Sequence, residues 1–256
     1  MGLEADHVVH NSDRVIGQQI HFFRELSSTN DLAAEWGVDR RHHGTVIVAD
    51  QQSAGRGQHG RVWQASPGSS LLCSVIVVPP PQLLRPVILT AWVAVSLRSL
   101  VHDLVGIPAR IKWPNDLLVH GKKLSGILIE QRGATIVGFG VNLTQSATDF
   151  ADAGLPEATS LQILGGQRYD REDVLDRLLS ALDQSYAGLL KGDYASLEQD
   201  WNDGVGMVGH DVRIEAYDGS VILGRLRELT FQGLTLEDEL GTRVVAPETV
   251  RQLMLL

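Results

Sequence analysis

The sequence predicts an α+β fold, in which helices pack on a β-sheet and a small β-barrel follows at the C-terminal end. Short runs rich in β-branched residues at 45–49 and 71–78 are typical of buried strands. Two long segments, 85–104 and 171–190, have apolar residues at helical spacing. After residue 204, about five short stretches alternate apolar and polar residues between Gly or Asp-Gly turns, which is the pattern of a small barrel.

The other elements follow from local signals. The cluster Ser28-Thr29-Asn30 precedes an amphipathic run and is typical of a helix N-terminus. His120-Gly121 indicates a hairpin turn between two strands. A short third helix is expected at 195–201. Further strands are expected near 111 and at 117–119, 123–131 and 134–142.

The length of 256 residues suggests one large domain, or a large domain with a small one. Residues 1–19 carry little pattern and are expected to form a loose or lightly docked arm. We therefore expect a main domain over 20–204 and a C-terminal domain over 205–256, divided where the pattern changes.

The composition is that of a globular protein, with 43% hydrophobic and 21% charged residues. Lys and Arg number 22 and Asp and Glu 31, so the net charge is −9, which argues against binding nucleic acid over a broad surface. One cysteine, Cys73, excludes an intramolecular disulfide and a zinc site of several thiolates, and it is expected in the core. The nine histidines form no convincing ligand cluster.

Targeting signals are not evident in the sequence. The N-terminal residues lack a basic start followed by an apolar stretch, so no signal peptide is expected. The longest apolar run, near 86–95, is shorter than the ~18 residues that a membrane span needs. The sequence thus predicts a soluble, cytoplasmic protein without a membrane partner.

A Gly-rich segment, GRGQHGRVW at residues 55–63, connects two predicted strands. Its backbone N–H groups and two guanidinium groups suit closure over an anion. It matches neither the phosphate-loop pattern nor the dinucleotide fingerprint, because no helix follows it. The alternative is a solvated hairpin whose arginines are incidental.

A second segment, KWPND at 112–116, is followed by KKLSGILIE at 122–130. A lysine within an apolar strand pair needs a partner, such as a phosphate or carboxylate, because a buried ammonium is costly. Pro114 indicates a strand break, so Asn115 and Asp116 are expected to face a cavity. Gly126 would allow a ligand to approach the backbone closely. The alternative is a β-hairpin whose lysines reach solvent.

Together, these segments resemble the two signatures of the biotin protein ligases. GRGQHGRVW is similar to the family's Gly-Arg-Gly-x-x-Gly-Arg-x-Trp motif, and KWPNDLLVHGKKLSGILIE follows the second signature almost residue for residue. Ser28-Thr29-Asn30 matches the Ser-Thr-Asn stretch of the biotin pocket, and 138–142 matches the Gly-x-Gly-x-Asn strand. Order and spacing agree over roughly residues 20 to 250. The resemblance implies a mixed sheet like that of class II synthetases, as the catalytic domain, and an SH3-like C-terminal domain.

The resemblance also implies a two-step reaction with ATP, Mg²⁺ and biotin. The biotin carboxylate attacks the α-phosphate of ATP and gives biotinyl-5′-AMP and pyrophosphate. A lysine of a biotin carboxyl carrier domain then attacks the acyl carbon, which gives a biotinyl-lysine amide and AMP. Mg²⁺ is expected to be held mainly by the ATP phosphates.

Site residues are carried over from the matching motif positions. The residues implied to be catalytic are Lys123, Arg56 and Asp116. The residues implied to bind biotin are Ser28, Thr29, Asn30, Gln52, Gly55, Arg56, Lys123, Gly126, Leu128 and Gly140. The residues implied to bind ATP are Arg56, Gln58, Arg61, Trp63, Lys112, Asn115, Asp116, Lys123 and Asn142.

Two departures from the family pattern stand out. Gln58 occupies a position that is often Arg in the family, which removes a charge that helps to hold the adenylate. The stretch 157–161 offers no aromatic residue to stack on adenine, and Trp63 is expected to pack rather than to stack.

Three other functions fit parts of the pattern. A lipoate or octanoate protein ligase shares the superfamily but has different motifs. A non-enzymatic biotin sensor that regulates transcription would carry an N-terminal helix-turn-helix of about 60 residues, and the Ser-Thr-Asn stretch at 28 leaves no room for one. An inactive interaction domain would lack Lys123 or the loop arginines, which are present. Monomer and homodimer are both compatible with the sequence.

Overall fold

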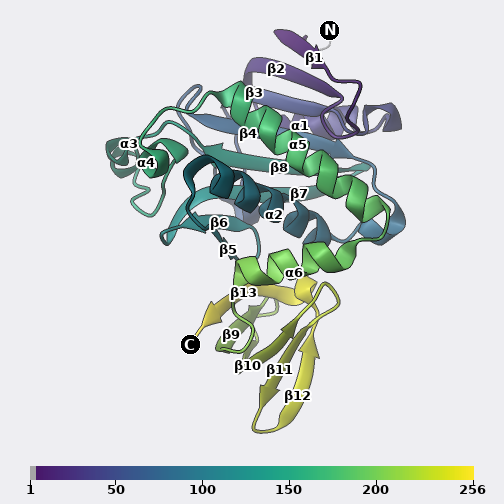
Figure 1. Ribbon diagram of the computed structural model, residues 1–256, viewed down its shortest axis with the longest axis vertical. Coiled ribbons are helices and arrows are strands. Elements are labelled where there is room, and N and C mark those ends of the chain that lie inside the picture. Colours follow the sequence, from purple (N-terminus) through teal and green to yellow (C-terminus); the bar gives the residue numbers. More distant parts are fainter. Residues whose placement is uncertain (1–3) are drawn as a thin grey trace.

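A computed structural model describes residues 4–256 as a mixed sheet with helices on both faces and a second, smaller sheet below it (Figure 1). The large sheet has eight strands in the order β1-β2-β3-β4-β8-β7-β6-β5, of which only β2 and β3 run parallel to each other. Its strands are β1 (His7–His10), β2 (Gln19–Leu26), β3 (Val46–Gln52), β4 (Ser70–Val77), β5 (Arg110–Lys112), β6 (Asp116–Val119), β7 (Lys122–Arg132) and β8 (Ala134–Asn142). The predicted mixed sheet is confirmed.

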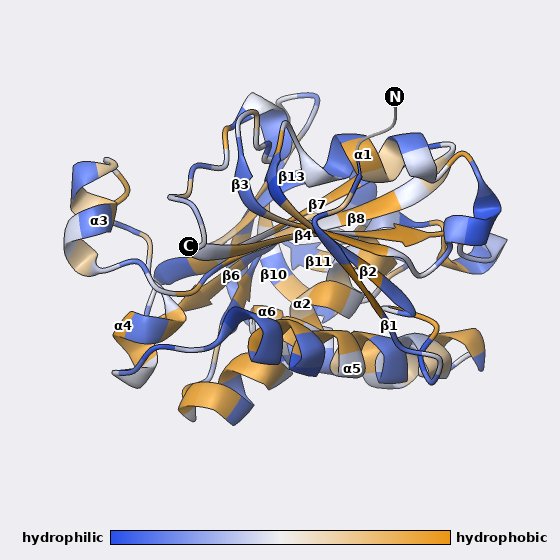
Figure 2. Ribbon diagram, turned by 90° about the horizontal axis from the view of Figure 1, so that it is seen from above, coloured by the Kyte–Doolittle hydropathy of each residue, from blue (hydrophilic) through white to orange (hydrophobic). Residues whose placement is uncertain are grey.

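Within the described residues, six α-helices surround this sheet. They are α1 (Thr29–Trp36), α2 (Pro86–Val105), α3 (Ala147–Asp152), α4 (Leu161–Gly165), α5 (Arg171–Leu190) and α6 (Tyr194–Val205). Figure 2 shows α1 on one face of the sheet and α2 with α5 on the other. The long predicted helices at 85–104 and 171–190 are confirmed as α2 and α5, and the third helix as α6.

The period-two alternation of the strands builds a separate apolar layer on each face. On β3, Val46 and Val48 belong to the large core under α2 and α5, whereas Ile47 and Ala49 join the smaller core under α1. All residues of β4 and β8 are buried, because these central strands are covered on both faces. Cys73 lies in the large core, as predicted, and burial raises the pKa of its thiol.

Helix α2 is long and apolar enough to cross a membrane by length and composition, but most of it is buried in the core. Pro86 occupies its first turn, where no N–H partner is lost, and Gly106 ends it in the left-handed region at φ 69°. The buried indole Nε1 of Trp92 donates to the carbonyl of Leu182, so its polar group is satisfied. These features are those of a core helix.

The C-terminal sheet contains five antiparallel strands in the order β12-β11-β10-β9-β13. Its strands are β9 (Asp211–Ala216), β10 (Val221–Leu229), β11 (Leu234–Asp238), β12 (Gly241–Val245) and β13 (Val250–Leu255). The five predicted strands are confirmed, in keeping with an SH3-like domain. The hydrogen-bonded ladder is open between β12 and β13 in the described residues, so it does not close into the predicted barrel.

An aromatic stack joins the two sheets. The rings of Trp113 and Trp201 lie 5.7 Å apart, and Trp201 stacks on Phe231 of the C-terminal part at 5.3 Å. The indole Nε1 of Trp113 also donates to the carbonyl of Val250 on β13. These contacts place β13 beside the β5–β6 end of the large sheet.

Strand β1 lies within the predicted arm of residues 1–19 and pairs antiparallel with β2 at the edge of the large sheet. The backbone N–H groups of Val15 and Ile16 donate to the carboxylate of Asp183 on α5. Residues 1–3 lie outside the described range. The division into domains at residues 19 and 204 stays a prediction.

A half-buried histidine, His43, predicts a loss of stability in mild acid. Burial, helped by the charge of Arg40, lowers the pKa of His43, and the N–H of Val78 donates to its Nδ1. Because the folded pKa lies below the unfolded value of 6.5, stability is complete above that value and falls as the pH drops below it. We expect the free energy of unfolding to decrease from about pH 7.5 to about pH 5.

Denaturant titration of the wild type and His43→Asn across this pH range measures the effect. The variant should show a shallower decrease, with a residual slope from His21, whose pKa burial also lowers. Equal slopes in the two proteins would contradict the assignment to His43.

Candidate active site

A pocket of about 650 Å³ opens where the Gly-rich loop, the large sheet and β13 meet. The loop, residues 55–63, covers β7 and β8, and the opposite wall comes from the turn before β6 and from residues 154–158. Arg251 to Met254 of β13 contribute a further wall from the C-terminal sheet. Segments distant in the sequence therefore form one cavity.

The strand break predicted at Pro114 is confirmed, because β5 ends at Lys112 and β6 begins at Asp116. The break is held against β7: the side-chain Nδ2 of Asn115 donates to the carbonyl of Ile127 at 2.6 Å, and the N–H of Ile127 donates back to the Asn115 carbonyl at 2.9 Å. These two hydrogen bonds hold Asn115, and with it Asp116, in place at the pocket wall.

Two glycines that are paired across β7 and β8, Gly126 and Gly140, form a flat floor under the indole of Trp63. A Cβ added at Gly140 would lie 2.5 Å from the indole ring, and one at Gly126 would lie 3.1 Å from it. Trp63 thus packs against the sheet, as expected, rather than standing free. Its indole Nε1 is buried without a hydrogen-bond partner among the described residues, inside the pocket.

Lys123 points into the pocket beside Asp116. The Lys123 Nζ lies 2.7 Å from the Asp116 carboxylate and 5.7 Å from the centroid of the Trp63 ring. The lysine side chain is 35% exposed and the aspartate 15%, so the pair is shielded but reachable. The lysine predicted to need a partner therefore has a carboxylate beside it, and it faces the cavity rather than bulk solvent.

The backbone of Lys123 is fixed as well. Its N–H donates to the carbonyl of Glu157, and its carbonyl accepts from the N–H of Thr159. The amide of Asn142 donates to the Thr159 carbonyl at 3.0 Å and thereby ties β8 to the same segment. In this arrangement the Asn142 side chain is engaged with protein groups.

Neutral polar side chains line the opposite part of the pocket, at the start of α1. The backbone N–H and the hydroxyl of Thr29 both donate to Oε1 of Gln52, at 2.7 and 3.1 Å. The hydroxyl oxygen of Ser74 on β4 lies within hydrogen-bond distance of the Thr29 hydroxyl, at 2.7 Å, and of Oδ1 of Asn30, at 2.5 Å. Ser28 precedes the helix and is buried, with no capping hydrogen bond from its side chain. The cluster Ser28-Thr29-Asn30, which was predicted at a helix N-terminus, is therefore a group of buried polar side chains at the start of α1.

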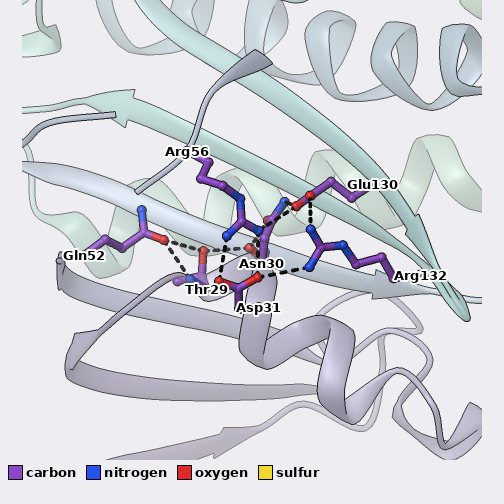
Figure 3. A network of polar contacts seen from close by, with 8 residues as sticks. Thr29, Asn30, Asp31, Gln52, Arg56, Glu130 and Arg132 are labelled. Atoms are coloured by element: carbon purple, nitrogen blue, oxygen red, sulfur yellow. Dashed lines mark hydrogen bonds and ion pairs between the residues drawn. The ribbon is translucent and has the colours of Figure 1, made fainter. Parts of the chain in front are cut away.

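Arg56 is held by two carboxylates (Figure 3). Its guanidinium donates to both oxygens of Asp31, at 2.6 and 2.8 Å, and to Glu130 at 3.1 Å. The Asn30 amide donates to the same Glu130 oxygen at 2.6 Å. The prediction gave Arg56 a role at phosphate, whereas the structure shows its guanidinium occupied by carboxylates.

The structure brings together nearly all of the predicted site residues. Every one except Gly55 lines the pocket. Gly55 is buried at the base of the loop, where its carbonyl accepts from the N–H of Trp63, and a Cβ there would lie 2.6 Å from the Trp63 carbonyl. Arg61 and Lys112 line the pocket and make no ion pair among residues 4–256. The ligand roles of all these residues remain predictions.

Several residues in and beside the pocket lack a signal in the local sequence pattern. Residues 251–254 belong to the C-terminal sheet, and only the tertiary packing of β13 brings them to the pocket. Asp31, Glu130 and Arg132 join Arg56 from positions up to 101 residues apart in sequence. Among residues 4–256, no group of three or more His, Cys, Asp or Glu side chains is placed to hold a metal ion.

Comparison with known proteins places this fold and pocket in a class of protein-modifying ligases. A model described as the biotin/lipoate A/B protein ligase family matches residues 22–143. The biotin–[acetyl-CoA-carboxylase] ligase of Mycobacterium tuberculosis is 34% identical over 248 residues, which cover 91% of this chain and 90% of that protein. The chain belongs to the biotin/lipoate A/B protein ligase family, and the resemblance to biotin protein ligases is confirmed.

Other relatives agree. The bifunctional ligase/repressor BirA of Bacillus subtilis is 32% identical over 212 residues, and the match covers 80% of this chain and 65% of the length of that protein. The biotin protein ligase of Aquifex aeolicus, solved with biotin and ATP, superposes with a TM-score of 0.77 at 26% identity. That superposition covers 93% of this chain and 99% of the other.

Proposed function

We propose that this protein is a biotin protein ligase, which activates biotin with ATP and transfers the biotinyl group to a lysine of a biotin carboxyl carrier domain. The observation that carries the proposal is one pocket with a fixed lysine, Lys123, on one wall and a neutral polar set at Ser28, Thr29 and Gln52 on another. Such a pocket suits a ligand with an anionic reacting end and a neutral polar ring.

In the first step, a biotin carboxylate oxygen bonds to the α-phosphorus of ATP and the bond to pyrophosphate breaks. This reaction brings a carboxylate to a polyanion, so fixed positive charge must offset their repulsion. Lys123 supplies that charge inside the pocket, and its pair with Asp116 holds the ammonium in place. Arg61 and Lys112, which line the pocket, supply charge for the outer phosphates.

The ureido ring of biotin has one carbonyl acceptor and two N–H donors. Both acceptor positions of Gln52 Oε1 are used by Thr29, so Gln52 offers a ligand only its amide N–H donors. The Ser28 hydroxyl can donate or accept. The wall at the start of α1 therefore has donors for the ring carbonyl, and Gly126, Leu128 and Gly140 line the apolar path to Lys123.

In the second step, the amine of the acceptor lysine attacks the acyl carbon of the adenylate, the bond to the phosphate oxygen breaks, and AMP leaves. A mixed anhydride hydrolyses readily, so water must be kept out until the acceptor arrives. The Gly-rich loop lies over the reacting end of the pocket and serves this purpose. Asp116, beside Lys123 in the pocket, is the carboxylate that we assign to the incoming amine.

Mg²⁺ would accompany ATP. The donor set favours an ion held chiefly by phosphate oxygens, because residues 4–256 provide no cluster of metal ligands and Asp116 is already paired with Lys123. When bound, the ion neutralises phosphate charge. We propose a cytoplasmic location, because the one cysteine is free and buried and because ATP and carrier domains are intracellular substrates.

Adenylate formation without an acceptor tests the proposal. The full chain is incubated with ATP, Mg²⁺ and either biotin or lipoate, and the acyl adenylate and pyrophosphate are quantified. We expect stoichiometric adenylate with biotin and none above background with lipoate. Adenylate from lipoate alone would assign the chain to the lipoate branch of the family instead.

Gln58 predicts a measurable property of the adenylate complex. Gln58 lines the pocket within the loop, where an arginine would add a cation beside the phosphate. Gln58→Arg should therefore slow the release of biotinyl-5′-AMP by about tenfold, as expected for one charge-assisted hydrogen bond. The release rate is measured by chasing labelled adenylate with unlabelled biotin and ATP. An unchanged rate would show that residue 58 makes no retaining contact.

A further inference from the structure

Four charged side chains form a closed ring beside the pocket, here named the charge ring: Arg56, Asp31, Arg132 and Glu130 (Figure 3). Positive and negative groups alternate around it. Asp31 contacts Arg56 at 2.6 Å and Arg132 at 3.2 Å, and Glu130 contacts Arg56 at 3.1 Å and Arg132 at 3.0 Å. Each charge thus faces two opposite charges.

The ring joins a loop to rigid elements. Asp31 lies in the first turn of α1, and Glu130 and Arg132 lie two residues apart on β7, so their side chains share one face of the sheet. Arg56 belongs to the Gly-rich loop. The fixed elements therefore provide both carboxylates, and the loop provides the cation that they hold.

Besides Arg56, the loop is attached to the sheet through the Trp63 indole at its end, which packs on Gly126 and Gly140. Within it, the N–H of Gly57 donates to the Arg61 carbonyl, and the N–H of Trp63 donates to the Gly55 carbonyl. Across residues 4–256, Arg56 makes the only side-chain hydrogen bonds that link residues 55–61 to the rest of the chain. His59 lies on Tyr217 of the C-terminal part at 5.7 Å between ring centroids, which is a weaker contact.

The pair of Asp31 and Arg56 within the charge ring favours the ionised form of both groups. The hydrogen bonds and charge of Arg56 lower the pKa of Asp31, and the same carboxylate raises the pKa of Arg56. Arg132 offsets the repulsion that two carboxylates around one guanidinium would otherwise feel. Glu130 is 18% exposed and Arg56 33%, so solvent screens the ring only in part.

We propose that Asp31 and Glu130 are positioning residues for the Gly-rich loop: they hold the Arg56 guanidinium and thereby keep the loop in place over the pocket, with Arg132 balancing their charge. Arg56 is then an anchor of the loop, and the phosphate-facing cations are Lys123, Arg61 and Lys112. The catalytic consequence rests on the proposed ligase function; the ordering of the loop does not.

Limited trypsin digestion of the ligand-free full chain tests the ordering directly. Trypsin cleaves after Arg56 and Arg61 when the loop opens, and Lys191, in the exposed turn after α5, serves as the internal reference site. Asp31→Asn and Glu130→Gln remove one ring charge each at nearly constant volume. We expect cleavage after Arg56 and Arg61, relative to Lys191, to be about tenfold faster in either variant, equivalent to about 1.4 kcal/mol.

A matched control is Asp39→Asn, which removes a 2.6 Å pair with Arg41 on the surface and should leave loop cleavage unchanged. The proposal is overturned if neither ring variant accelerates loop cleavage. It is also overturned if cleavage after Lys191 rises in proportion, because the ring would then stabilise the whole fold rather than the loop.

A second readout concerns the reaction. In Asp31→Asn, biotinyl-5′-AMP should dissociate about tenfold faster than in the wild type, and Asp31→Glu, which keeps the charge, should restore part of the difference. Unchanged dissociation in Asp31→Asn would contradict the role in retention. A wild type that forms no adenylate would refute the ligase proposal, while the digestion result would still decide the positioning proposal.

Discussion

Lys123→Ala is expected to slow adenylate formation by about a thousandfold, with little change in overall fold. The ammonium is less exposed than the other pocket cations Arg61 and Lys112, and it lies 2.7 Å from Asp116 and near the Trp63 ring. Removing one preorganised charge-stabilising donor typically costs a factor of about 10² to 10³, and a full charge acts at the upper end. The loss should appear in kcat rather than in the KM for biotin. The reason is that the ammonium stabilises the transition state, in which the biotin carboxylate meets the charged α-phosphate.

Single-turnover formation of biotinyl-5′-AMP measures the effect. The matched control is Lys122→Ala, which removes the neighbouring lysine: Lys122 is exposed, begins β7 and does not line the pocket. That variant should react within about twofold of the wild type, as expected for a surface substitution. A Lys123→Ala protein that keeps more than about a tenth of the wild-type rate would show that another group provides the main stabilisation.

Gly140→Ala is expected to raise the KM for biotin by about 30-fold. The new Cβ would lie 2.5 Å from the Trp63 ring, closer than side-chain carbons approach. Residue 140 is buried on β8 between two hydrogen-bonded strands, so the backbone has little room to yield and the indole must move. Overpacking of this kind costs about 1–3 kcal/mol, and a moved indole distorts the pocket wall that the biotin tail follows.

Steady-state kinetics at saturating ATP measure this KM. The control is Gly188→Ala on α5, where the nearest atom to a new Cβ is 4.0 Å away and alanine is favoured by helix propensity. Its KM should equal that of the wild type and its melting temperature should be equal or higher. An unchanged biotin KM in Gly140→Ala would mean that the position of the Trp63 indole does not affect biotin binding.

Local sequence patterns predicted the elements of this fold better than their arrangement. The bounds of α2 and α5 and the hairpin at His120-Gly121 follow from apolar period and turn chemistry, which act over a few residues. Strand order does not, because β4 pairs with β8 across more than 50 intervening residues. The open C-terminal ladder has the same origin: strand count is local, whereas closure depends on pairing between distant edges.

The pocket shows the same division. Motif residues such as Lys123, Gly126 and Gly140 were predicted because their types and spacing match one family. The partners of Arg56 were not, since a carboxylate 25 residues before it and another 74 residues after it carry no local signal. The motif assigned Arg56 to phosphate, and its pairing with Asp31 in the structure is the basis of the positioning role proposed above.

Transfer of biotin to an acceptor is the most direct test of the proposed function. The full chain is mixed with biotin, ATP, Mg²⁺ and an apo biotin carboxyl carrier domain, and the intact mass of the carrier is followed with time. We predict that the carrier gains a single biotinyl group on its acceptor lysine, and that a carrier with this lysine replaced by arginine gains none. A carrier that stays unmodified, or that accepts lipoate in place of biotin, would contradict the proposed function.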